Sequence, residues 1–178
     1  VATLGDIYNA RDLSTRAGAD PYDPAPAILD LYRNGKLDRL AEANGQYCAA
    51  IYDAPAHRLT LVTDRHALFP LHVWLGDGEA VFGSMIYVVL GDARIPRKAN
   101  RDVLAQLFTM QRTVGGYTSV AGVEALPAAC IWSIGREGVR ERRYWELKWR
   151  RPDFSRAECS HALHRALQRL RDRWRCRE

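Results

Sequence analysis

Runs of apolar, β-branched and aromatic residues recur along the chain and predict antiparallel strands joined as hairpins. Val1–Leu4 is typical of the end of a further strand. Each pair of longer runs is separated by a short segment that carries turn residues, as hairpin loops do. The predicted hairpins are Tyr47–Asp53 with Arg58–Asp64 across Ala54–His57, His72–Leu75 with Glu79–Ser84 across Gly76–Gly78, and Cys130–Ile134 with Val139–Trp145 across Gly135–Gly138.

Apolar residues at helical spacing lie between these strands. The helix that includes Ile28 and Leu31 is predicted to begin near Pro26 and to end at Gly35. Another is predicted for Asn100–Met110 with Asn100 as its N-cap. Short helices are predicted for Asn9–Thr15, Leu37–Ala43 and Met85–Leu90. Hairpins with interleaved helices predict an α+β fold.

The C-terminal part has a different pattern. Glu146–Phe154 is rich in charged and aromatic residues and predicts a linker. Ser155 followed by Glu158 is a capping-box arrangement, which predicts the start of a helix. The apolar stripe of this helix recurs at helical spacing and consists of Ala162, Leu163, Ala166, Leu167, Leu170 and Trp174.

Composition narrows the class of protein. The chain has 178 residues, of which 47% are hydrophobic and 26% charged, as in a soluble globular protein long enough to bury a core. The sequence has no apolar run long enough to cross a bilayer, and its start lacks the pattern of a signal peptide. We therefore expect no membrane association and, by default, a cytoplasmic location.

Charge and cysteines suggest no further site. The net charge of +5 comes mainly from arginines between Arg136 and Arg177. A solvated helix face and a linker account for them, and the absence of an aromatic RNA-binding pair or a recognition helix argues against nucleic acid. Cysteines occur at positions 48, 130, 159 and 176 without metal-ligand spacing, which predicts reduced thiols and no metal site.

Several segments, in order, resemble the class II (Ntn-type) glutamine amidotransferase domain of the asparagine synthetase family. Gly5–Asn9 resembles the Asn-Gly-Glu-Ile-Tyr-Asn motif of that domain, and Asn44–Asp53 resembles its Asn-Gly strand. The other matches are Leu61–Arg65 with Pro70–Leu71 for the Arg-Asp-Arg-x-Gly-x-x-Pro-Leu turn, Phe82–Ser84 for Phe-Ala-Ser-Glu, and the Leu126–Pro127 and Tyr144–Trp145 landmarks.

The resemblance implies an αββα sandwich and two regions. Residues 1–147 are expected to form the amidotransferase-like domain, and residues 148–178 the linker and first helix of an ATP-dependent synthetase domain. Because the family's first strands precede the motif at Gly5, the resemblance implies that the N-terminal portion is missing. We therefore expect an exposed sheet edge near Val1–Leu4.

The resemblance also implies how the family cleaves glutamine. An N-terminal cysteine supplies the attacking thiol, and its own α-amine serves as the base. Residue 1 here is Val, and the internal cysteines have amide nitrogens, which cannot serve as that base. We therefore predict that the chain alone has no catalytic residue and does not hydrolyse glutamine.

The positions that contact glutamine in the family are altered. The Asn-Gly pair of the oxyanion hole falls on Leu4 and Gly5, which removes a side-chain donor of a kind worth about 10²–10³ in rate. The following Glu is Asp6. The Asp that binds the glutamine ammonium falls on Pro24, although Asp23 could replace it if the loop has shifted by one residue.

The remaining motif positions are ones that do not contact glutamine in the family, and some of them are kept while others are changed. Ala67 replaces the glycine of the turn, and Met85 replaces the Glu after Phe82–Ser84. The kept residues are predicted to shape the sheet, with Asp53, Asp64 and Arg65 as turn residues and a surface ion pair. These structural residues are Asn44, Gly45, Asp53, Asp64, Arg65, Pro70 and Leu71.

Three functions are compatible with this pattern. The first is a degenerate amidotransferase domain that supports a fused or separate ATP-dependent synthetase domain, in which ATP and Mg²⁺ would act. Relatives of that kind include β-lactam synthetases and lasso peptide cyclases. The sequence leaves open which product is formed, whether the chain forms a homodimer and whether a precursor peptide is its partner. The second is a fragment of an active glutamine-hydrolysing asparagine synthase. The third is a basic, non-enzymatic interaction module.

Overall fold

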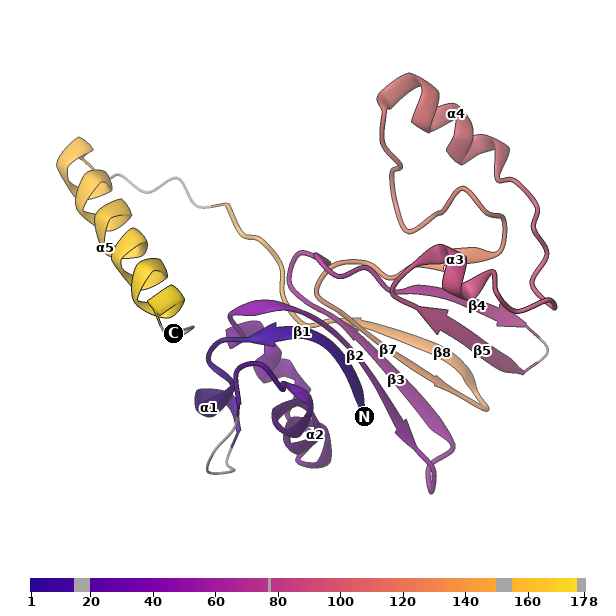
Figure 1. Ribbon diagram of the computed structural model, residues 1–178, viewed down its shortest axis with the longest axis horizontal. Helices are drawn as coiled ribbons and strands as arrows, with labels where there is room; N and C mark the ends of the chain where they lie inside the picture. Colours follow the sequence, from indigo (N-terminus) through magenta and orange to yellow (C-terminus); the bar gives the residue numbers. More distant parts are fainter. Residues whose placement is uncertain (15–19, 77, 150–154, 176–178) are drawn as a thin grey trace. The chain divides into compact units, whose positions relative to one another are not determined.

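The computed structural model describes residues 1–14, 20–76, 78–149 and 155–175 (Figure 1). The chain divides into two compact units, Val1–Glu146 and Leu147–Glu178. The first unit contains both sheets and every described helix except the last one.

A five-stranded antiparallel sheet forms the centre of the first unit (Figure 1). Two of the predicted hairpins lie in it. The predicted loop Ala54–His57 joins the strands of one, whereas Gly135 and Gly138 of the other predicted loop are paired strand ends and only residues 136–137 form the turn. The N-terminal strand is an edge of this sheet, as expected, but it continues to Ile7 rather than ending at Leu4. In spatial order the strands are β1 (Ala2–Ile7), β2 (Gly45–Asp53), β3 (Arg58–Thr63), β7 (Cys130–Gly135) and β8 (Gly138–Arg143).

A second antiparallel sheet has three strands. The third predicted hairpin forms β4 (His72–Gly76) and β5 (Glu79–Gly83). β6 (Val123–Ala125) pairs with the other side of β4, so the order is β5-β4-β6. The sequence pattern did not predict β6, because three residues are too few to establish an alternating pattern.

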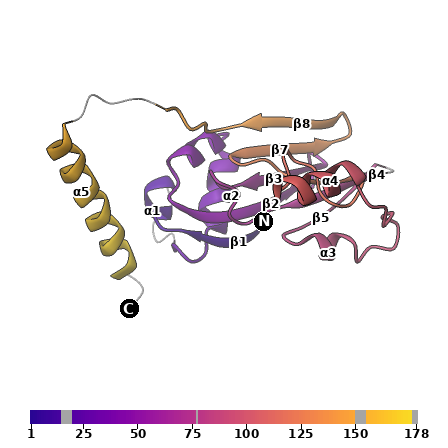
Figure 2. The same cartoon turned by 90° about the horizontal axis from the view of Figure 1, so that it is seen from above.

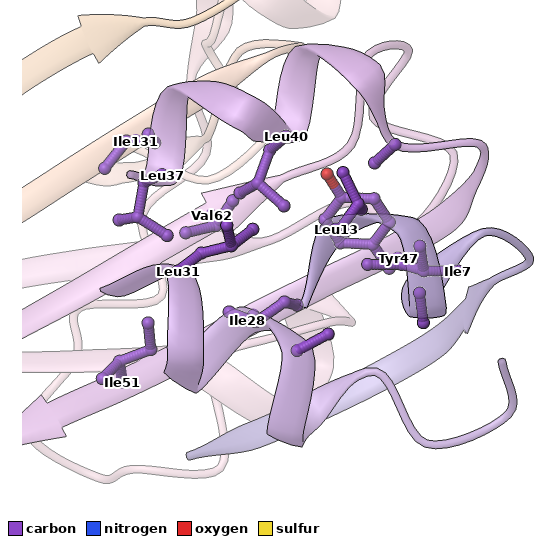
Figure 3. Packing of buried hydrophobic residues seen from close by; sticks show 14 residues of the cluster. Ile7, Leu13, Ile28, Leu31, Leu37, Leu40, Tyr47, Ile51, Val62 and Ile131 are labelled. Carbon is purple, nitrogen blue, oxygen red and sulfur yellow. The ribbon is translucent and has the colours of Figure 1, made fainter. Parts of the chain in front are cut away.

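Three short helices cover one face of the five-stranded sheet. They are α1 (Ala10–Leu13), α2 (Ala25–Arg33) and the 3₁₀-helix η1 (Leu37–Glu42). Ile28 and Leu31 of α2 pack with Leu40 of η1 onto Ile51 and Val62 of the sheet (Figure 3). The predicted Asn9–Thr15 helix ends at Leu13, and Thr15 lies outside the described residues.

The other face of the five-stranded sheet packs on the three-stranded sheet. Because strand side chains alternate, β2 directs Ile51 to the helices and Cys48 to the second sheet. Likewise β4 directs Val73 to the interface between the sheets and Trp74 outwards, where it packs near α3 (Ile86–Val89). The layers are therefore helix, sheet, sheet and helix, as the resemblance implied.

One helix of the first unit lies outside these layers, and one helix belongs to the second unit. Asn100 caps α4 (Arg101–Met110) as predicted, since its side chain accepts a hydrogen bond from the Val103 N–H. α4 lies at the end of the unit away from α1 and α2 (Figure 2). In the second unit, Ser155 and Glu158 form the predicted capping box before α5 (Arg156–Arg175). No helix in the described ranges is both long and apolar enough to cross a membrane.

Candidate functional site

The residues that the resemblance places at the glutamine site lie on the edge strand β1. Leu4 is directly opposite Cys48 of β2, and Asp6 is opposite Gln46. The Leu4 side chain is 43% exposed and has no group that donates a hydrogen bond. At this point of the strand the side chain therefore cannot stabilise an oxyanion.

Gly5 is the point at which β1 comes closest to its surroundings. Its φ is +94°, a conformation that glycine adopts without strain. A Cβ atom at this position would lie 2.1 Å from the Gln46 carbonyl oxygen and 2.7 Å from the Phe69 ring. Only a residue without a side chain fits between β2 and Phe69.

Asp23 and Pro24 form the turn that begins α2, and this turn meets the end of β1. The Ile7 N–H donates to the Pro21 carbonyl oxygen at 3.0 Å. Asp23 uses its carboxylate locally, since Oδ1 accepts the Ala25 N–H at 3.2 Å. Pro24 is the N-cap residue, and its side chain has no polar atom that could bind an ammonium group.

Asp64 organises the turn that follows β3. It is 1% exposed, and its carboxylate accepts backbone N–H groups of His66 at 2.8 Å, Leu68 at 3.0 Å and Tyr47 at 3.3 Å. The prediction of a turn residue is confirmed. The prediction of a surface ion pair is wrong for Asp64, because the carboxylate is buried among backbone donors.

Arg65 contacts an amide oxygen and an indole ring instead of the carboxylate that an ion pair would require. Its Nη2 donates to Asn44 Oδ1 at 3.1 Å, and its guanidinium lies 5.7 Å from the centre of the Trp145 ring. The His66 ring meets the same indole edge-on at 5.5 Å. Arg65 therefore joins Asn44, just before β2, to Trp145, one residue before the first unit ends.

The remaining motif residues shape the fold. A Cβ on Gly45 would lie 2.0 Å from the Asp6 carbonyl oxygen, so β1 and β2 can approach only at a glycine. Asp53 accepts the Ala56 N–H in the hairpin loop and the Tyr32 hydroxyl of α2. Leu71 is buried between the sheets, and Pro70 is exposed just before it.

The described thiols are not poised for nucleophilic attack inside the sandwich. Cys48, opposite Leu4, is 4% exposed, and burial raises the pKa of its thiol to about 11. Burial also raises the pKa of the Cys130 thiol to about 12. Both thiols are therefore protonated at neutral pH and are weak nucleophiles. Cys159 is exposed but belongs to the second unit.

One buried network was not foreseen. The Tyr144 hydroxyl donates to the Thr63 carbonyl oxygen at 2.6 Å and lies 3.2 Å from the Tyr47 hydroxyl. Burial raises the pKa of Tyr144 to about 12 and raises that of Tyr47 as well. Both phenols therefore stay neutral and act as hydrogen-bonding groups. No local pattern in the sequence could link two tyrosines so far apart.

These residues divide into two groups. Leu4, Gly5 and Asp6 lie on β1, whose last residue Ile7 meets the Asp23–Pro24 turn, while Phe69, in the turn after β3, packs on Gly5. The described residues contain no group of three or more His, Cys, Asp or Glu side chains that could hold a metal ion.

Comparisons with known proteins agree with this fold. Residues 1–145 match a family model described as "Glutamine amidotransferase domain". The chain is 26% identical over 160 residues to a Methanocaldococcus jannaschii protein named "Putative asparagine synthetase (glutamine-hydrolyzing) 2". That match covers 84% of this chain and 30% of the relative.

Two solved structures share the fold. The glutamine phosphoribosylpyrophosphate amidotransferase of B. subtilis superposes with a TM-score of 0.51 at 13% identity. The match covers 82% of this chain and 29% of the B. subtilis chain. A structure described as the allosteric regulatory enzyme of purine biosynthesis superposes with a TM-score of 0.52 at 15% identity, and this match covers 82% of this chain and 28% of that one. The fold is thus the Ntn-type sandwich of amidotransferases, and the chain spans less than a third of each of these proteins.

Proposed function

The chain belongs to the glutamine amidotransferase domain family, and we propose that it is a member that does not hydrolyse glutamine. In this proposal the domain serves as a scaffold for an ATP-dependent synthetase domain that forms amide bonds. The observation that carries the proposal is Leu4, which the motif resemblance places where the family has the amide donor of its oxyanion hole. A leucine cannot replace that hydrogen bond.

Two further features support the loss of glutamine chemistry. Pro24 has no carboxylate for the ammonium group, and the neighbouring Asp23 directs Oδ1 to the Ala25 N–H at the start of α2. The raised pKa values of Cys48 and Cys130 keep both thiols protonated, so neither is suited to attack an amide. The proposal therefore rests on residues inside the chain and not on its first residue.

The synthetase partner is supported by the relatives. The M. jannaschii protein named as an asparagine synthetase is matched over only 30% of its length, which leaves room for a further domain. A domain that cannot release ammonia fits a synthetase that uses an amine already present in its substrate, as β-lactam synthetases and lasso peptide cyclases do. ATP and Mg²⁺ would act in that synthetase domain.

The test compares glutamine hydrolysis by three proteins: this chain, the full natural protein and its Leu4→Asn variant. Ammonia release is measured with and without a glutamine analogue that alkylates catalytic thiols, and mass spectrometry records any adduct. We expect no ammonia and no adduct for the first two proteins. Glutamine-saturable ammonia release by the natural protein, blocked by the analogue, would overturn the proposal and favour an active glutaminase.

The Leu4→Asn variant tests which residue carries the defect. It restores the amide donor, so analogue labelling that appears only in this variant of the full protein would support Leu4 as the altered position. Loss of one oxyanion donor lowers the catalytic rate by a factor of about 10²–10³. If the natural protein proves active and Leu4→Asn raises its rate of ammonia release by tenfold or less, this role of Leu4 is contradicted.

A further inference from the structure

The turn Asp64–Pro70, here called the Asp64 turn, is held together by hydrogen bonds to Asp64. Its buried carboxylate accepts the N–H groups of His66 and Leu68, and the Asp64 carbonyl oxygen accepts those of Ala67 at 3.2 Å and Ala129 at 2.8 Å. Rearrangement of Asp64 would leave the N–H groups of the buried residues Tyr47 and Ala129 without this acceptor, so the turn resists it.

One end of the Asp64 turn packs on β1. The Phe69 ring lies where a side chain on Gly5 would be, 2.7 Å from the position of its missing Cβ. Phe69 also packs into the core between the two sheets. Close-packed interiors transmit displacements because they contain few voids to absorb them. A shift of β1 at Gly5 therefore displaces Phe69.

The other end of the Asp64 turn holds Trp145. The Arg65 guanidinium faces the indole ring and the His66 ring meets it edge-on, so two consecutive residues of the turn clasp one side chain. The neighbouring Tyr144 is fixed independently through its hydroxyl bond to Thr63. Trp145 thus lies at the point where the chain leaves the first unit, one residue before its end.

We propose that the Asp64 turn is a conformational link that couples the position of β1 at Gly5 to the packing of Trp145 at the end of the first unit. A ligand or partner that moves β1 would change the direction in which the chain leaves this unit. By thermodynamic linkage, a partner that binds around Trp145 would change β1 to the same extent. The link rests on these contacts and is independent of whether glutamine is hydrolysed.

The test places a reporter on Trp145. The chain is labelled with 5-fluorotryptophan, and the fluorine resonance of Trp145 is assigned with Trp145→Phe. Phe69→Leu alters the β1 end of the turn, and Arg65→Lys keeps the charge but removes the planar contact with the indole. We expect both variants to move the Trp145 resonance by more than its linewidth.

Phe82→Leu is the matched control, because Phe82 also packs in the core between the sheets but lies on β5. It should move the resonance of Trp132, which shares that core, and leave Trp145 in place. An unmoved Trp145 resonance in Phe69→Leu, or an equal shift in Phe82→Leu, would overturn the proposal. The resonance of Trp74 reports whether each variant is folded, and Phe69→Met is the milder substitute.

A double-mutant cycle tests the link by a second measurement. The unfolding equilibrium constants of Phe69→Leu, Trp145→Phe and the double variant are compared in denaturant. Coupled residues deviate from independence, and we expect the double variant to differ from the product of the single effects by about threefold or more. The Phe82→Leu and Trp145→Phe pair should combine independently, and independence in both pairs would refute the link.

Discussion

At the scale of single residues, Ala67 adopts a backbone conformation that its side chain disfavours. Its φ is +50°, and it stands where the Arg-Asp-Arg-x-Gly-x-x-Pro-Leu turn of the family has a glycine. A left-handed conformation costs a residue with a Cβ about 1–2 kcal/mol. We predict that Ala67→Gly raises the free energy of unfolding by about 0.5–1 kcal/mol, once the greater entropy of an unfolded glycine is subtracted. Denaturant unfolding at low protein concentration measures it.

Ala128→Gly is the control for this prediction. Ala128 also lies in a loop but is not among the residues with positive φ. Its substitution should lower the free energy of unfolding by roughly 0.5–1 kcal/mol, because glycine then adds only unfolded-state entropy. A destabilised Ala67→Gly would show that the left-handed backbone at this position carries no strain.

At the scale of elements, the β1–β2 pair depends on a glycine that no larger residue can replace. We predict that Gly5→Ala abolishes the native pairing of β1, since its methyl group would overlap the Gln46 carbonyl oxygen and the Phe69 ring in addition to the strain of φ +94°. The expected loss is more than about 3 kcal/mol, as for other severe backbone clashes. Hydrogen exchange of the β1 and β2 amides measures it directly.

Gly35→Ala separates strain from collision. Gly35 has a φ of +65°, but nothing lies within 4 Å of the position of its Cβ. This variant should therefore lose only the conformational part, about 1 kcal/mol, and keep the exchange protection of β1. Equal losses in the two variants would mean that close packing against Gln46 and Phe69 does not restrain β1.

Elements with a strong local pattern were predictable from sequence, whereas the contacts between them were not. The hairpin β2–β3 and the cap at Asn100 follow from alternation and from capping chemistry, which act over a few residues. β6 was missed because a three-residue strand is specified by its partner β4 and not by its own sequence. The same limit applies to boundaries, as shown by β1 continuing to Ile7.

The candidate site shows this limit most clearly. The assignment of Leu4 and Pro24 to the glutamine site follows from motif order alone and stays a prediction. The surroundings of Asp64 could not be predicted from the sequence. A carboxylate beside an arginine in the sequence suggests an ion pair, yet folding buries Asp64 among backbone donors and turns Arg65 towards Asn44 and Trp145.

At the scale of the whole molecule, the two units differ in what stabilises them. The first unit has three apolar cores, which lie between its helices and sheets. In the second unit, the described side chains of α5 include Leu163, Leu167 and Leu170, which are half-exposed. A helix whose apolar stripe remains exposed gains little stability from packing. Because the cores of the first unit consist of its own residues, we expect those residues to set its stability.

This expectation predicts where the chain can be shortened. A chain ending at Glu146 should retain the unfolding free energy of the first unit, because Tyr144 and Trp145 remain with their partners. A chain ending at Arg143 loses the Tyr144 bond to Thr63, the bond from the Tyr144 N–H to the Ala129 carbonyl at 2.9 Å and the indole contact of Arg65. Deletion of a fully buried aromatic side chain costs about 3–5 kcal/mol, and because this shorter chain loses two half-buried ones with their hydrogen bonds, we expect a loss of about 3 kcal/mol.

Tyr144→Phe in the full chain isolates the hydroxyl group from the rest of this effect. It keeps the ring but leaves the Thr63 carbonyl oxygen and the Tyr47 hydroxyl without their partner, at a cost of about 1–2 kcal/mol. Denaturant unfolding should therefore show that the chain ending at Glu146 is the most stable of the three proteins. The Tyr144→Phe variant should be less stable, and the chain ending at Arg143 the least stable. If the chain ending at Arg143 matched the one ending at Glu146, the aromatic residues at the end of the first unit would not anchor the sandwich, and the Asp64 turn would have no fixed partner there.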